Sequence, residues 1–181
     1  VLALAVAGPA FAQAVTYRVT FPEPEHHWMQ VEVTFSGLGN RPLQARMSRS
    51  SPGRYAVHEF AKNIFAVDAF NGKGDPLTYT RPTPYQWHVA GHDGIVRIVY
   101  KIFGDRGDGT YFAVDTTHAR LNIPATLMWG VGLETRPARV TFVPPVNSAW
   151  KVATQLFATS DPFTFTAPNL QYLMDSPAEL S

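Results

Sequence analysis

The chain has 181 residues, 45% of them hydrophobic, which is enough for one domain with a substantial core. Its 15 Lys and Arg residues nearly balance its 14 Asp and Glu residues and are scattered along the chain, which argues against a nucleic-acid-binding surface. Cysteine is absent, so disulfides are excluded, and the 15 Pro and 13 Gly residues favour short strands and turns over helices.

The first 14 residues have the pattern of the end of a secretory signal peptide. An apolar stretch is followed by Ala10-Phe11-Ala12, a small-x-small cleavage site, so residues 1–12 would be a signal-peptide remnant. The alternative is a buried apolar N-terminal strand. The stretch is shorter than the roughly 20 apolar residues of a membrane span. We therefore expect an exported protein, periplasmic or secreted, with no membrane span.

Alternation of apolar and polar residues is the main secondary-structure signal, and it predicts strands with one face on a core. In chain order it covers residues 16–21, 27–35, 139–142 and 163–166. Residues 94–103 are apolar on both faces, which predicts a central strand covered on two sides. Residues 54–71 fit either a helical stripe or strands, and we favour two strands with a turn near Lys62-Asn63.

Turn signals rich in Gly, Asn and Asp separate these segments, and no internal repeat or low-complexity linker is visible. The pattern predicts an all-β fold, an antiparallel two-sheet β-sandwich with little helix. We expect one domain over residues 13–175 and the start of a connection to a further domain at 176–181. The polar loop 104–110 carries Asp105 and Asp108, but a β-hairpin turn is favoured there over a calcium site.

A single His-Glu pair, His58-Glu59, begins a zinc-peptidase motif that the chain does not complete. The motif H-E-x-x-H needs its second histidine four residues after the first, and Lys62 occupies that position. No serine-nucleophile elbow G-x-S-x-G is present either. We therefore expect no catalytic residue, no metal site and no cofactor in this chain.

Four segments, in a consistent order and spacing, resemble the non-catalytic N-terminal domain of the glycyl aminopeptidase family. They are 17–35, 47–65 with P-G-x-Y and E-F-A-x-N, 114–126 with D-x-x-H-A-x-x-N-x-P-A, and 167–177. The chain departs from the family at Ser48 and Ser50, where proline and tryptophan are common. Members are secreted or periplasmic zinc metallopeptidases that carry H-E-x-x-H in a following domain, often with a PDZ module.

The resemblance implies that zinc and the chemistry belong to a parent enzyme, and that this domain packs on its own C-terminal catalytic domain. It also implies peptide substrates with a free N-terminus. Two groups of residues are then candidates for the substrate cleft or the domain interface: Asp115, His118 and Asn122, and Asn169, Gln171, Tyr172 and Asp175.

Each group also has a structural interpretation. Asp115 and Asn122 could satisfy nearby backbone amides in turns, while His118 or Asp115 could instead form hydrogen bonds at a cleft edge. In related aminopeptidases, polar groups near the junction lie close to the peptide amine, so Gln171 or Asp175 resembles an amine-binding contact.

A free-standing secreted β-sandwich that binds carbohydrate or a protein partner is the alternative. It would need the four tryptophans, Trp28, Trp87, Trp129 and Trp150, to form an exposed row, whereas their apolar neighbours favour core positions.

Overall fold

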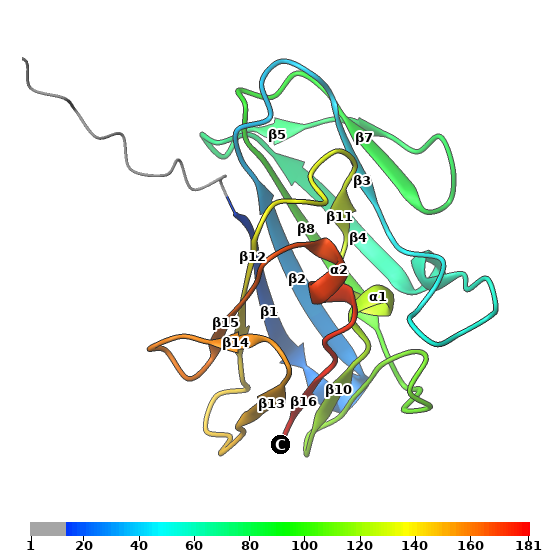
Figure 1. Ribbon diagram of the computed structural model, residues 1–181, viewed down its shortest axis with the longest axis vertical. Helices are drawn as coiled ribbons and strands as arrows, with labels where there is room; N and C mark the ends of the chain where they lie inside the picture. The colour runs from blue at the N-terminus through cyan, green and yellow to red at the C-terminus, as the bar shows by residue number, and fades with distance from the viewer. Residues whose placement is uncertain (1–13) are drawn as a thin grey trace, which may run out of the picture.

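A mixed eight-stranded sheet is the largest layer of the computed structural model, which describes residues 14–181 (Figure 1). Its spatial order is β14 (Phe157–Ala158), β15 (Thr164–Ala167), β12 (Ala138–Val143), β1 (Val15–Glu23), β2 (Trp28–Phe35), β8 (Val96–Phe103), β4 (Ile64–Phe70) and β5 (Pro76–Leu77). The expected signal-peptide remnant, 1–12, lies outside the described residues.

The alternating segments form strands as expected. In β1 the buried residues are Val15, Tyr17, Val19 and Phe21, and in β2 every second residue from Met29 to Phe35 is buried. The two strands form an antiparallel pair, but β1 also pairs in parallel with β12. A parallel neighbour needs a crossover, and here more than a hundred residues separate the two strands. The large sheet is therefore mixed rather than purely antiparallel.

Strand β8 lies between β2 and β4, but only one of its faces is fully buried. Its outward residues are partly exposed, and two of them form cross-strand ion pairs, Arg97 with Glu32 (3.0 Å) and Lys101 with Glu23 (3.4 Å). The expectation of a strand covered on both sides is wrong, because charged side chains keep the outer face partly in water.

Residues 54–71 contain one strand rather than two. The segment begins as an exposed loop, continues as a 3-10 turn, η2 (Phe60–Asn63), and only then forms β4. A bulge between Phe65 and Asp68, with Ala66 at φ 47°, interrupts the pairing of β4 with β8. The extra residue reverses the alternation, so Ile64 faces the core and Phe65 is 47% exposed.

Two four-stranded sheets complete the fold. One has the order β13 (Val152–Thr154), β16 (Ala178–Leu180), β10 (Ala119–Leu121) and β9 (Ala113–Val114). The other has the order β11 (Trp129–Gly130), β3 (Leu43–Arg46), β7 (Gln86–Val89) and β6 (Tyr79–Thr80). All three sheets bury their apolar residues in one core. The all-β fold class is confirmed.

The helices are short: η1 (Pro24–His26), α1 (Ile123–Thr126) and α2 (Leu170–Met174). Figure 1 shows α1 and α2 in front of the large sheet. None of the helices in the part of the chain that the structure describes is long and apolar enough to cross a membrane.

The segment 176–181, expected to begin a connection, contains β16. This strand pairs with β13 on one side and β10 on the other, and Ala178 and Leu180 are buried. The segment has only three residues of strand and no long apolar run, so its place in the core could not be read from alternation.

Candidate functional site

An open depression of about 570 Å³ lies on the sheet that contains β16. Its walls come from β10, β13 and β16, from the end of α2, and from two loops at 51–52 and 109–111. Two of the predicted site residues, Asn122 and Asp175, line it. The other five do not, so the structure brings only part of the predicted set together.

Asn122 joins the two loops that border the depression. Its side-chain amide donates to the Thr110 carbonyl and to the Ser51 hydroxyl (3.1 Å), and Ser51 Oγ lies 3.3 Å from Asn122 Oδ1. Ser51 is itself buried. Asn122 therefore holds two segments of distant sequence at fixed positions, instead of capping backbone amides in its own turn.

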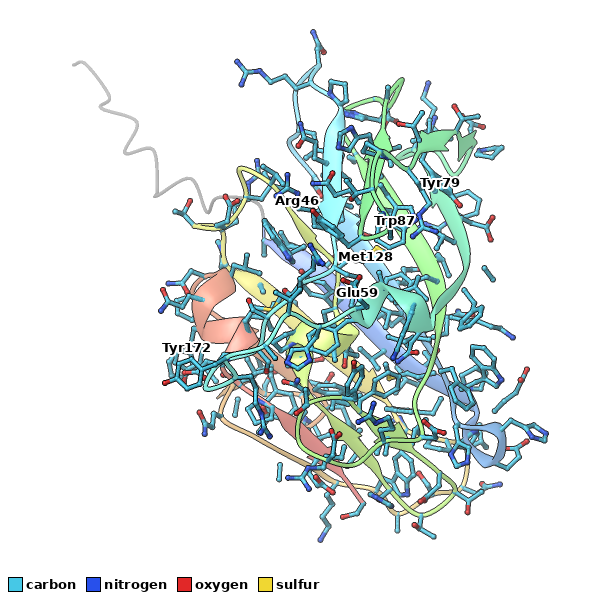
Figure 2. The ribbon with its side chains drawn as sticks, turned by 90° about the vertical axis from the view of Figure 1, so that its right-hand side faces the viewer. Arg46, Glu59, Tyr79, Trp87, Met128 and Tyr172 are labelled. Carbon is cyan, nitrogen blue, oxygen red and sulfur yellow. The ribbon has the colours of Figure 1, made fainter. Side chains whose placement is uncertain are left out.

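Two buried tyrosines of the large sheet hold the segment that follows Asn122 in place by hydrogen bonds to its backbone. Tyr17 Oη donates to the Met128 carbonyl (2.9 Å), and Tyr100 Oη donates to the Thr126 carbonyl (2.8 Å). Tyr100 Oη also accepts from the Met128 amide (3.0 Å). Burial raises the pKa of both phenols far above its usual range, so they stay neutral donors. Met128 lies in the middle of the molecule in Figure 2.

Asp115 organises the turn between β9 and β10. Its Oδ1 accepts hydrogen bonds from the Thr117 hydroxyl (2.6 Å), the Thr117 amide (2.6 Å) and the His118 amide (3.0 Å). The imidazole Nδ1 of His118 lies 3.1 Å from the second oxygen. The Thr117 hydroxyl and then the backbone amides and His118 lower the pKa of Asp115 to about 2.

The Asp115 side chain is 39% exposed and that of His118 is 40% exposed. The bonds from the Thr117 and His118 amides confirm the expectation that Asp115 bonds nearby backbone amides. One carboxylate oxygen is used within the turn, and the other faces His118 at the surface. The turn presents a fixed negative charge to solvent at neutral pH.

The second predicted group lies on and around α2. Asn169 caps the helix, because its Oδ1 accepts from the Tyr172 amide (2.9 Å). Tyr172 stacks on Phe157 at 5.0 Å and donates to the Gln155 carbonyl (2.8 Å). It lies at the edge of the molecule in Figure 2. Gln171 is exposed on α2, so this group is divided between a helix cap, a surface stack and, at Asp175, the depression.

A family model described as the peptidase M61 N-terminal domain matches residues 16–181. The chain belongs to this family. The match extends from β1 to the end of β16, so this M61 N-terminal domain includes the whole described fold.

Solved structures share the fold. An aminopeptidase N family protein from Idiomarina loihiensis matches 92% of this chain with a TM-score of 0.86 and 21% identity. An M1 zinc metallopeptidase from Deinococcus radiodurans matches 93% of it with a TM-score of 0.52 and 14% identity. The chain spans 29% and 41% of the lengths of those two proteins. No match was found among curated proteins.

The described residues of this M61 N-terminal domain do not fit a zinc ion. A protein zinc site needs three or four converging ligands, and residues 14–181 contain no group of three or more His, Cys, Asp or Glu side chains so arranged. At the His-Glu pair, the imidazole of His58 stacks on Phe60 and Glu59 pairs with Arg49. The zinc of related peptidases has no ligand set in this part of the chain.

The tryptophans do not form an exposed row. Trp87 and Trp150 are buried, and Trp150 packs edge-on against Phe21. Trp28 is half-buried on the outer face of the large sheet, edge-on to Phe65 and Phe103. Edge-to-face rings offer no flat platform for a sugar, so this arrangement does not favour the carbohydrate-binding alternative.

Several residues of the depression were not predicted from the sequence. Arg120 and Glu179 face each other across β10 and β16, with 3.8 Å between Arg120 Nε and Glu179 Oε2. Tyr111 lies below two cationic groups, those of Lys62 and Arg106. Finding Arg120 and Glu179 required the pairing of β10 with β16, and strands of three residues give no readable alternation.

Proposed function

We propose that this M61 N-terminal domain is the non-catalytic part of an exported zinc-dependent aminopeptidase. In this proposal it packs against a catalytic domain that follows it and forms one wall of the cleft for peptide N-termini. The observation that carries the proposal is the family match over residues 16–181, since it covers every strand of the fold. Zinc and the reacting groups then belong to the catalytic domain.

Within this proposal, Asp115 is the group that meets the peptide amine. Its carboxylate stays ionised because its pKa is about 2, and its turn is fixed by three hydrogen bonds. A charge-assisted hydrogen bond to an ammonium is stronger than a neutral one. His118 would hold the second oxygen in place. The sequence-based prediction assigned the amine contact to Gln171 or Asp175 and gave Asp115 a place at the cleft edge, so these two residues are tested as well.

The test uses the complete enzyme and a glycyl anilide substrate. Asp115→Asn should raise KM about tenfold to a hundredfold, because a hydrogen bond to a charged group contributes about 1.5–3 kcal/mol. Asp161→Asn is the matched control, since Asp161 also accepts bonds from its own turn, from the Phe163 amide and the Thr164 hydroxyl. If both variants have the same kinetics, Asp115 does not bind the amine. Asp175→Asn and Gln171→Ala, assayed in parallel, then show whether Asp175 or Gln171 makes this contact.

Export is a separate part of the proposal and rests on the pattern of residues 1–14. When the gene is expressed with its natural leader, N-terminal sequencing of the mature protein should start near Gln13. A mature protein that retains Ala10-Phe11-Ala12 would contradict cleavage at this site.

A further inference from the structure

The loop of residues 49–59, between β3 and η2, projects from the domain at the right of Figure 1. Its two ends are joined, because the His58 amide donates to the Arg49 carbonyl (2.8 Å) and Arg49 pairs with Glu59. The turn within it is closed by the Arg54 amide, which donates to the Ser51 carbonyl (3.0 Å). The loop thus has its own hydrogen bonds.

The tip of this loop is apolar and exposed. Residues 52–57 are all exposed; Tyr55 has the full exposure of an isolated residue, at 105%, and Val57 is 69% exposed. Most tyrosine rings in folded proteins lie at least partly against neighbours, and one ring can bury about 150–250 Å². Tyr55, Ala56 and Val57 together form a continuous exposed apolar run, the kind of surface that a protein partner covers.

The returning end of the loop rests on a cluster of aromatic side chains. His58 stacks on Phe60 with ring centres 5.0 Å apart, and Tyr111 packs edge-on against Phe60 at 5.2 Å. Phe60 is fully buried. This packed base fixes the place where the tip leaves the domain.

The loop is also continuous with the depression. Ser51 and Pro52 line it, and Ser51 is bonded to Asn122 on the neighbouring wall. The opposite wall includes β16, and Ser181, directly after it, exchanges two backbone hydrogen bonds with Lys151. In Figure 1 the C-terminus lies at the end of β16. A domain that follows Ser181 would therefore start from the sheet that bears the depression.

We propose that the loop 49–59 is the element that inserts into the catalytic domain of the same enzyme, with Tyr55 as its buried anchor. This inference rests on the proposed function and names the contact that makes the two domains one unit. Tyrosine and arginine dominate the energetics of interfaces, and Arg54 stands beside Tyr55 with no ion pair among the described residues. The receiving pocket is therefore apolar, with a carboxylate at its rim.

Hydroxyl-radical footprinting tests the contact directly. Tyr55 is labelled in the 181-residue chain and in the complete enzyme, and the turn that contains Val146, which is 90% exposed, serves as the internal reference. We expect labelling of Tyr55 to fall about fivefold or more in the complete enzyme, since the centre of an interface is packed like a protein interior.

The outcomes separate this inference from the proposed function. Protection of other surfaces but not of Tyr55 would overturn the loop as the docking element and leave the packing of the domains standing. No protection anywhere in this chain would overturn both. Protection of Tyr55 only after a peptide inhibitor is added would assign the loop to substrate and also overturn the inference.

A pair of matched variants gives an independent readout. In the complete enzyme, Val57→Asp should lower the melting temperature by about 5 °C or more, while Val146→Asp should change it by about 1 °C or less. Both valines are exposed in this chain, so neither substitution should change the melting temperature of the 181-residue protein. An equal loss from Val57→Asp in both proteins would indicate a role within the loop itself and contradict docking.

Discussion

The hydroxyl of Tyr100 should contribute more to stability than any other tyrosine hydroxyl in this domain. It is fully buried, donates to the Thr126 carbonyl and accepts from the Met128 amide. Tyr100→Phe keeps the shape of the ring but leaves a buried carbonyl and a buried amide without this partner. Each unsatisfied group costs about 1–3 kcal/mol, so the free energy of unfolding should fall by about 2–6 kcal/mol.

Two other tyrosines calibrate this value. Tyr17→Phe removes one buried hydrogen bond, to the Met128 carbonyl, and should cost about 1–3 kcal/mol. The Tyr79 hydroxyl bonds the Val67 carbonyl at 3.1 Å in a partly exposed position, where water can replace it. Tyr79→Phe should therefore cost less than about 1 kcal/mol.

Urea denaturation, followed by tryptophan fluorescence at constant m-value, measures all three differences. The predicted order of destabilisation is Tyr100→Phe, then Tyr17→Phe, then Tyr79→Phe. If Tyr100→Phe costs no more than Tyr79→Phe, the two buried tyrosines do not fix the segment after Asn122, and the reasoning is refuted.

Three further predictions concern backbone and charge. Gly104→Ala should lower the free energy of unfolding by about 2 kcal/mol or more, because a Cβ at this position would lie 2.0 Å from the buried Phe112 ring. At Gly107 the nearest atom to an added Cβ is 3.8 Å away, so Gly107→Ala should be nearly neutral in the same urea assay. Ala66→Gly should leave the free energy of unfolding unchanged or raise it by up to about 1 kcal/mol, because Ala66 has φ 47°, a conformation that glycine adopts more easily. Ala158→Gly, on an exposed strand, should lower it. A loss of stability at both sites would show that Ala66 is not strained. Asp115 has a folded-state pKa of about 2, below its unfolded value, so its stabilisation is present above about pH 4 and is lost as the pH falls through 2. The gap in urea midpoint between the natural protein and Asp115→Asn should therefore close over that range, and a gap that is constant with pH would contradict the low pKa.

The long strands of this fold could be predicted from sequence because their apolar and polar residues alternate. Residues 29–35 alternate strictly, and β2 buries every second one of them from Met29 onward. Alternation does not predict the buried face of β4, because the bulge at Ala66 turns Phe65 outward. Nothing local marks that bulge, because alanine is not a residue that favours positive φ.

The candidate site was harder to predict because distant segments build it. Asn122 and Ser51 are 71 positions apart, and the wall opposite them comes from β16 near the C-terminus. The local role of Asp115 was foreseeable, because a turn aspartate bonds the amides that follow it. The bond from Asn122 to Ser51 was not, since it depends on the tertiary fold.

A crystal structure of the complete enzyme with a peptide bound tests the central claim most directly. The account predicts that the turn of Asp115 and His118 faces the catalytic domain, with an Asp115 oxygen within about 3 Å of the amine of the bound peptide. If that turn and the depression beside Asn122 both face solvent, with the peptide held by the catalytic domain alone, the domain does not shape the cleft and the account is wrong.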